Sequence, residues 1–332
     1  MATVAVAALA GCSPGTGSPP TPRPGSPAVS SSQGPASPSG SPTPSSRTGP
    51  PRRESPSPSP EPAAFDRARA LRHVRVLAGR IGPRLATGPA FREAAGYVER
   101  RLARAGYEVS RQRFDVPAGD SWGVPVAAGT SLNLVGRPRG FDPSSPYLVV
   151  GAHLDTVAVA PGAEDNASGI AVLLELARLA GDAGTAGTRL PTVLVAFGAE
   201  EPRGPGDALH HFGSRAYVQR MTGAEHRRLR GMVSLDRVGV GGRVPVCSGP
   251  LSGPRVREGL LTVGRRLRIP TGSCGVNTSS DHWSFEKAGI SVARLGSTPY
   301  AGYHSAGDVP AVVGGDQLAR VGRLTWAWLR AR

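Results

Sequence analysis

The chain has 332 residues and a formal net charge of +15, and nearly all of its positive charge comes from arginine because Lys287 is its only lysine. The arginines are scattered, without a long basic run or interleaved aromatic side chains, so we expect no nucleic-acid partner. The length is sufficient for one large α/β domain with a buried core.

Residues 1–12 are predicted to be an export signal. The apolar run from Val4 to Ala10 is too short to cross a bilayer, and Leu9-Ala10-Gly11-Cys12 resembles the bacterial lipobox, in which the cysteine carries the lipid. No Lys or Arg precedes this run, which departs from the usual signal-peptide pattern. We expect an extracellular or cell-surface lipoprotein that contacts the membrane only through an anchor on Cys12.

Residues 13–62 are expected to form a disordered tether, because they are almost all Pro, Ser, Gly and Thr and cannot bury enough apolar surface to fold. The folded domain is therefore expected over residues 63–332. If Cys12 is lipidated, Cys247 and Cys274 remain as a pair. In an oxidising compartment they would form a disulfide, and the alternative is two buried free thiols.

Helical periodicity and apolar runs alternate along the folded part. Helices are expected at Ala63–Ile81, Ala90–Ala105, Gly169–Ala180, Ser214–Met221, Pro254–Leu267 and Gln317–Leu329. Strands are expected at Tyr107–Val116, Leu132–Val135, Tyr147–Ala152, Thr192–Phe197, Met232–Leu235 and Ser291–Leu295. This order predicts a three-layer α/β/α fold, in which helices cover both faces of a central, largely parallel sheet.

Acidic and histidine side chains follow the ends of four predicted strands. Glu200 and Glu201 come just after Thr192–Phe197, a strand whose lack of alternation indicates burial on both faces. Three other strands lead to the remaining residues of this kind, which are His153 and Asp155, Asp236, and His304. Because ligands bind outside the carboxyl ends of the strands in this fold class, we expect these side chains to converge.

Their residue types suit a pair of metal ions. Zinc binds histidine nitrogen and carboxylate oxygen, and two zinc ions need a shared carboxylate plus one histidine and one carboxylate each. The candidates for these positions are His153, Asp165, Glu201, Asp236 and His304. Asp155 could then hold the imidazole of His153 from behind, which leaves Glu200 free to act as a general base.

Each ligand candidate also has an ordinary structural explanation. Asp165 could cap the helix expected over residues 166–180, because Asp is favoured at that position. Asp236 could belong to a turn, and His153 and His304 could be satisfied polar residues at strand ends.

Short motifs occur in a fixed order along the folded part. They comprise Gly151-Ala-His-Leu-Asp-Thr-Val157, Gly162-Ala-Glu-Asp-Asn-Ala-Ser-Gly169, Ala199-Glu-Glu201, Asp236 and Tyr303-His304, with Gly213-Ser-Arg-Ala-Tyr217 and Ser280-Asp-His282 plus Phe285 as further matches. This series resembles the M28 family of zinc aminopeptidases from about Phe65 to Arg332. The resemblance implies a mixed, mostly parallel sheet of eight strands between two helical layers.

The resemblance also implies a metal-dependent exopeptidase that removes N-terminal residues from peptides with two zinc ions. His153 and Asp236 would bind one ion, and Glu201 and His304 would bind the other. Asp165 would bridge the two ions.

Catalytic roles follow from the same resemblance. Asp155 would orient His153, and Glu200 would take a proton from the attacking water and pass it to the leaving amine. Tyr303 would either hydrogen-bond the developing oxyanion or form a packed wall of the pocket. Asp281 and His282 would shape the pocket without binding metal. The remaining histidines are expected to be surface or packing residues, namely His73, His210, His211 and His226.

Two other functions stay open at this stage. A glutaminyl cyclase of this fold would use one zinc ion to convert N-terminal glutamine to pyroglutamate. A non-catalytic, peptidase-like surface protein would have lost metal ligands. The retention of all five ligand positions favours hydrolysis over both alternatives, and the sequence predicts no particular oligomeric state.

Overall fold

The computed structural model describes residues 64–184 and 187–331. The expected signal at 1–12, with Cys12, and the expected tether at 13–62 lie outside the described residues and stay predictions. Within the described ranges, no helix combines the length and the apolar character that a membrane span requires.

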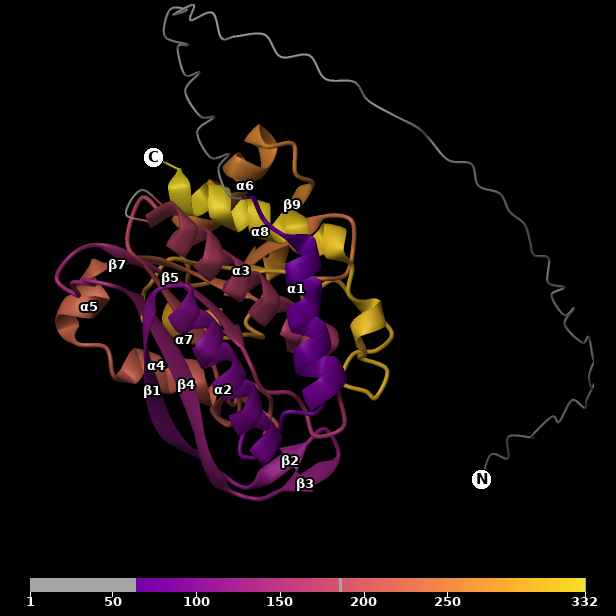
Figure 1. Cartoon of the computed structure of the whole chain (residues 1–332). Helices are drawn as coiled ribbons and strands as arrows, with labels where there is room; N and C mark the ends of the chain where they lie inside the picture. Colours follow the sequence, from indigo (N-terminus) through magenta and orange to yellow (C-terminus); the bar gives the residue numbers. More distant parts are fainter. Residues whose placement is uncertain (1–63, 185–186, 332) are drawn as a thin grey trace, which may run out of the picture. The chain divides into compact units, whose positions relative to one another are not determined.

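A mixed sheet of eight strands forms the centre of the fold (Figure 1). The strands are β1 Tyr107–Val116, β4 Gly129–Pro138, β5 Tyr147–His153, β6 Thr192–Phe197, β7 Leu229–Leu235, β8 Val244–Ser248, β9 Thr271–Val276 and β10 Val292–Leu295. Across the sheet they lie in the order β1-β4-β6-β5-β7-β10-β8-β9. The central strands β6, β5, β7 and β10 are parallel, so their carboxyl ends meet at one edge of the sheet.

Helices cover both faces of this sheet. They are α1 Arg67–Val74, α2 Pro89–Arg104, α3 Ser168–Ala183, α4 Phe212–Gln219, α5 Gly223–Arg228, α6 Arg255–Arg266, α7 His282–Lys287 and α8 Gly315–Arg330. Helices α1, α2, α3, α6 and α8 contribute to one hydrophobic core, whereas α4 and α7 contribute to a second. The predicted three-layer α/β/α architecture is confirmed.

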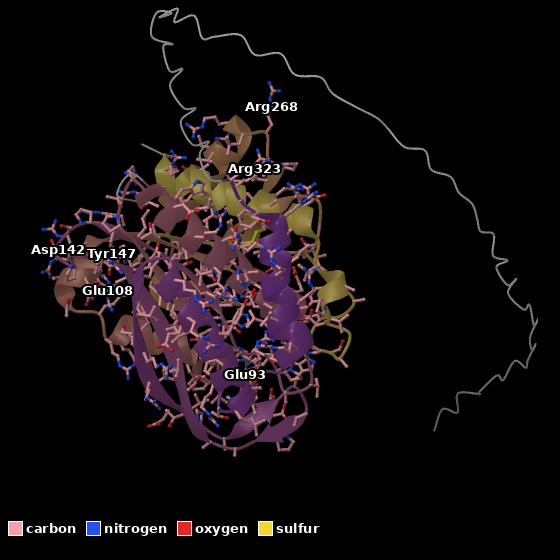
Figure 2. The ribbon with its side chains drawn as sticks, viewed as in Figure 1. Glu93, Glu108, Asp142, Tyr147, Arg268 and Arg323 are labelled. Carbon is pink, nitrogen blue, oxygen red and sulfur yellow. A yellow bond between two sulfur atoms is a disulfide. The ribbon has the colours of Figure 1, made fainter. Side chains whose placement is uncertain are left out.

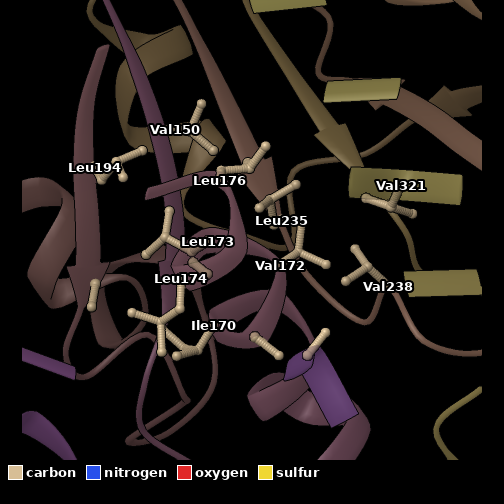
Figure 3. Close-up of a cluster of buried hydrophobic side chains, with 14 of the residues drawn as sticks. Val150, Ile170, Val172, Leu173, Leu174, Leu176, Leu194, Leu235, Val238 and Val321 are labelled. Atoms are coloured by element: carbon tan, nitrogen blue, oxygen red, sulfur yellow. The ribbon is translucent and has the colours of Figure 1, made fainter. Parts of the chain in front are cut away.

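The two cores lie on opposite faces because successive residues of a strand point in opposite directions. In β5, Val150 belongs to the first core and Val149 belongs to the second. Figure 3 shows the first core, where Leu173 and Leu176 of α3 lie near Val150 and Leu235 of the sheet. Helix α3 is apolar on nearly all sides and is buried accordingly.

Every predicted helix and strand is present, Tyr107–Val116 and Thr192–Phe197 with the predicted ends and the others with shifted ends, but the sequence reasoning missed several short elements. The Gly/Pro-rich segment between β1 and β4 contains a hairpin, with β2 at Gly119–Ser121 and β3 at Val124–Val126. Strands β8 and β9 and helices α5 and α7 were also not predicted. Strands of three residues are too short to show a period, and β9 lacks a continuous apolar run.

Cys247 of β8 and Cys274 of β9 form a disulfide, so the alternative of two free thiols is wrong. The two strands are paired in parallel, and their Cα atoms at the disulfide are 5.1 Å apart. The bond therefore ties the outermost strand to the sheet.

Charged side chains are distributed in two ways. Many are exposed, and Arg268 beyond the end of α6 projects outward in Figure 2. A second group is buried, and it includes most of the acidic and histidine residues that follow the central strands. Burial of so many ionisable groups at one edge of a sheet indicates a functional site.

Candidate active site

The carboxyl ends of the four central strands bring the predicted metal ligands together. His153 is the last residue of β5, Asp236 directly follows β7, and Glu201 lies in the turn after β6. His304 lies in the loop after β10, and Asp165 lies in the irregular turn before α3. All five residues are buried, with exposed fractions of 6 % or less.

Asp165 lies between the two histidines. Its Oδ1 atom is 3.1 Å from Nε2 of His153, and its Oδ2 atom is 3.2 Å from Nε2 of His304. Oδ1 of Asp236 is 3.6 Å from Nε2 of His153, and Oε2 of Glu201 is 3.2 Å from Nε2 of His304. The five side chains therefore form two trios that share Asp165.

This donor set fits a pair of zinc ions. Burial and the neighbouring Asp165 raise the pKa of Glu201 to about 8, so its ionised form needs a positive partner. Oδ1 of Asp236 and Oε1 of Glu201 are buried without a hydrogen-bond partner in the part of the chain that the structure describes. Buried carboxylates with open lone pairs beside histidine nitrogens are the ligand types that zinc prefers.

The backbone around Asp165 is held by a second acidic residue. The carboxylate of Asp308 accepts the backbone N–H of Glu164 at 2.8 Å and that of Asp165 at 3.0 Å. The helix-capping explanation of Asp165 is wrong, because the side chain of Asn166 accepts the N–H of Gly169 at 2.9 Å instead. The side chain of Asp165 is thereby left for the two histidines.

Arg84 organises the loop between β5 and this turn. Its guanidinium is fully buried and donates to backbone carbonyl groups only. The five acceptors are the carbonyl oxygens of Leu154 at 2.9 Å, Leu77 at 3.1 Å, Gly82 at 3.0 Å, Pro161 at 2.6 Å and Gly162 at 2.9 Å. Arg84 thus joins the segment that follows His153 to the segment that precedes Asp165.

Asp155 supports both His153 and the two glutamates. Its carboxylate oxygens accept the backbone N–H groups of Glu200 and Glu201, both at 3.1 Å. Nδ1 of His153 is 3.2 Å from the backbone carbonyl oxygen of Asp155 and 3.7 Å from its carboxylate. A carbonyl only accepts, so Nδ1 carries a proton and Nε2 is left as the ligand atom. Asp155 therefore contacts the imidazole through its main chain more closely than through the predicted carboxylate.

Glu200 lies beside His153 and Asp236, but it is not one of the five predicted metal ligands. Its carboxylate is close to the ligand atoms of His153 and Asp236, and its Oε1 atom is 3.3 Å from Nε2 of His211. Burial raises the pKa of Glu200 to about 8, and Asp236 acts in the same direction, whereas His153 opposes it. Cations bound nearby favour the ionised carboxylate, which can then accept a proton.

A model of peptidase family M28 matches residues 133–329, which contain all five ligand positions and Glu200. The chain belongs to peptidase family M28.

Several proteins of known sequence or structure resemble the chain along most of its folded part. Leupeptin-inactivating enzyme 1 of Streptomyces exfoliatus is 29% identical over 252 residues, which are 73% of this chain and 50% of that protein. A zinc aminopeptidase structure from Bacillus subtilis gives a TM-score of 0.70 at 20% identity, over 80% of this chain and 94% of that one. Glutaminyl cyclase of Porphyromonas gingivalis gives 0.66 at 23% identity, over 80% and 98%. This chain thus spans half the length of the Streptomyces relative, and the structural likenesses establish the fold.

The β2–β3 hairpin lies against the loops that carry the predicted site residues, and the sequence analysis did not predict it. The N–H of Asp120 donates to the carbonyl of Arg203 at 3.0 Å, and the N–H of Ala158 donates to Oγ of Ser121 at 3.0 Å. These bonds join the hairpin to the loops that follow β6 and β5. The dipeptide Trp122-Gly123 at the turn was the available signal, because glycine is favoured in two-residue hairpin turns.

Trp122 and Tyr303 enclose the ring of His304. The centroid of the Trp122 ring is 4.3 Å from that of His304 at an interplanar angle of 86°, and Tyr303 stacks on His304 at 3.8 Å. Trp122 is 54% exposed and Tyr303 is 39% exposed. The stacked position of Tyr303 favours the pocket-wall interpretation of this residue.

His211 is a second residue that the M28 motifs do not reveal. The sequence predicts a surface or packing role, but its imidazole is buried and contacts the carboxylate of Glu200. Burial lowers the pKa of His211 to about 4, so the ring is neutral at physiological pH. Its position in the long loop between the glutamates and α4 gave no signal in the sequence.

Proposed function

We propose that the chain is a zinc-dependent aminopeptidase that removes N-terminal residues from peptides. His153 and Asp236 hold one zinc ion, Glu201 and His304 hold the second, and Asp165 is shared between them. One observation supports this proposal above all. The two carboxylate oxygens of Asp165 lie 3.1 Å and 3.2 Å from the Nε2 atoms of two different histidines, His153 and His304.

The bound ions supply a Lewis acid for the scissile carbonyl and lower the pKa of the attacking water. Glu200 accepts the proton of that water and passes it to the amine that leaves. Asp155 fixes the position of Glu200, because its carboxylate holds the backbone N–H of Glu200 and of the neighbouring ligand Glu201. The contact with His211 limits the rotation of the Glu200 carboxylate.

The environment of the site favours the end of a peptide. The buried carboxylate of Glu200, which is not assigned to a metal ion, attracts the ammonium group of a free N-terminus. The hairpin that carries Trp122 lies on one side of the site, and it is fixed to two neighbouring loops. Trp122 and Tyr303 offer exposed aromatic surface to a substrate side chain, and Tyr303 serves as a wall of the pocket.

The proposal is tested by incubating the zinc-loaded full-length protein with short peptides that differ in their first residue, including glutamine. Stepwise loss of N-terminal residues that a chelator abolishes supports the aminopeptidase. Loss of ammonia from the glutamine peptide alone assigns the protein to the glutaminyl cyclases. Unchanged peptides with every first residue would refute both activities.

Glu200→Gln tests the general base within the same assay. Glutamine has the shape of glutamate but cannot accept the proton, so we expect kcat to fall at least about 100-fold. Zinc content measured by mass spectrometry should stay unchanged, because Glu200 is not a ligand. A variant with near-normal kcat would exclude Glu200 as the base.

The proposal extends to the location of the protein. The disulfide between Cys247 and Cys274 is typical of an oxidising compartment and supports export. Lipidation of Cys12 would then anchor the peptidase at the outer face of the cell membrane. Metabolic labelling with a fatty acid tests this, since Cys12→Ser should abolish the label and release the protein.

A further inference from the structure

Arg294 forms a buried ion pair with one of the metal ligands. It lies in β10 with 1% of its side chain exposed, and its Nη2 atom is 2.7 Å from Oδ2 of Asp236. Its Nη1 atom donates to Oδ1 of Asn277 at 3.1 Å and to Oγ of Ser279 at 2.8 Å. These contacts fix the guanidinium against Asp236 and leave Oδ1 of Asp236 directed toward His153.

The guanidinium of Arg237 lies near the other carboxylate oxygen of Asp236. Nε of Arg237 is 3.9 Å from Oδ1 of Asp236, and the Arg237 side chain is only 15% exposed. Its guanidinium is also stacked 4.4 Å from the centroid of the Tyr303 ring. The single negative charge of Asp236 is therefore shared by two arginines.

In the other half of the site, no arginine of the described residues forms an ion pair with a predicted metal ligand. Glu201 makes an ion pair with His304 only, and Asp165 makes ion pairs only with His153 and His304, among the ion pairs formed by residues 64–184 and 187–331. The carboxylate of Glu201 thus has a histidine as its ion-pair partner, whereas the carboxylate of Asp236 also has two arginines. The two halves differ in charge although they contain the same residue types.

We infer that Arg294 makes the two metal positions unequal, so that the ion at His153 and Asp236 is held more weakly than the ion at Glu201 and His304. The inference rests on the proposed two-metal function. A unit charge near a divalent ion weakens binding by about tenfold or more, even with the dielectric constant of water. Removal of Arg294 would also leave the buried Asp236 with only the more distant Arg237 as an arginine partner, and a bound cation would replace the lost positive charge. Both effects predict tighter binding at this position when Arg294 is replaced.

The test measures zinc bound to the full-length protein at a series of buffered free zinc concentrations, with mass spectrometry as the readout. In the unmodified protein, the second equivalent should bind at a free zinc concentration at least about tenfold above that for the first. Asp236→Asn should remove the second step and keep the first. Arg294→Met should move the second step about tenfold lower, while Arg294→Lys, which keeps the charge, should leave two separate steps.

The outcomes separate this inference from the proposed function. Two equivalents that bind together in the unmodified protein overturn the inference and leave the two-metal site standing. The inference is also overturned if Asp236→Asn loses the first binding step. The same holds if the second step of Arg294→Met occurs at the same free zinc concentration as in the unmodified protein, or at a higher one. An unmodified protein that binds no zinc refutes the proposed function itself. If Arg294→Met fails to fold, as judged by circular dichroism, the unmodified protein, Asp236→Asn and Arg294→Lys still decide the question.

Discussion

Replacement of Arg84 by lysine should destabilise the protein despite keeping the positive charge. The guanidinium of Arg84 is fully buried and donates to five backbone carbonyl groups. A lysine ammonium has three donors on one atom and lacks the planar fork of arginine, so at least two carbonyl groups lose their partner. Hydrogen bonds to charged groups contribute about 1.5–3 kcal/mol each, which gives an expected loss of about 3–6 kcal/mol.

The measurement is urea denaturation of the metal-free protein, followed by circular dichroism, for the unmodified protein and for Arg84→Lys. Arg268→Lys is the matched control, because Arg268 is exposed and should change the free energy of unfolding by less than about 0.5 kcal/mol. Zinc affinity should fall in Arg84→Lys, since the acceptors at Pro161 and Gly162 directly precede the turn that carries Asp165. A loss of stability below about 1 kcal/mol with normal zinc affinity would refute this reasoning.

Three further predictions concern the pocket, the disulfide and the pH dependence of stability. Trp122→Ala should raise KM several-fold without changing zinc content, whereas Trp122→Phe should keep most of the affinity; equal KM values for both variants would exclude a substrate contact. Joint replacement of Cys247 and Cys274 by alanine should lower the free energy of unfolding by about 3–4 kcal/mol, since the bond closes a loop across a separation of 27 residues. Burial lowers the pKa of His73 to about 4, so stability should be lost as pH falls from about 6.5 to about 4. The loss from His73 should approach about 3 kcal/mol, and His73→Asn should flatten that part of the unfolding curve measured against pH.

The sequence predicted the fold, and it predicted which ligand candidates would converge, for a physical reason that the structure makes clear. Strands β5 and β6 lie at the centre of the sheet and are buried along their whole length, so their sequences are nearly continuous apolar runs. Histidine and acidic residues directly follow these runs. Such residues are rare at the ends of buried strands unless they have a function. Local patterns therefore located His153, Glu201 and Asp236.

The unpredicted residues depend on contacts between distant parts of the chain. Arg84 bonds to carbonyl groups as far along the chain as Gly162, and a backbone acceptor leaves no mark in the sequence of the segment that provides it. His211 contacts Glu200 because of the path of a long loop. The hairpin with Trp122 is defined by its bonds to two loops, and four elements, β8, α6, β9 and α7, separate the two arginines on Asp236 in the sequence. No periodicity or spacing could indicate these contacts.

The organisation of the buried charges shows how the fold maintains a site that is unfavourable by itself. Glu200, Glu201, Asp165 and Asp236 lie close together away from water, and burial alone raises the pKa of carboxylates. Fixed groups offset part of this cost: the N–H groups that Asp155 holds keep the two glutamates in place, and Arg294 pairs with Asp236. The remaining open oxygens are Oε1 of Glu201 and Oδ1 of Asp236, and the latter lies 3.6 Å from Nε2 of His153. The charges that the protein does not neutralise are thus located where two cations would be bound, and the half with fewer of them is the half that contains Arg294.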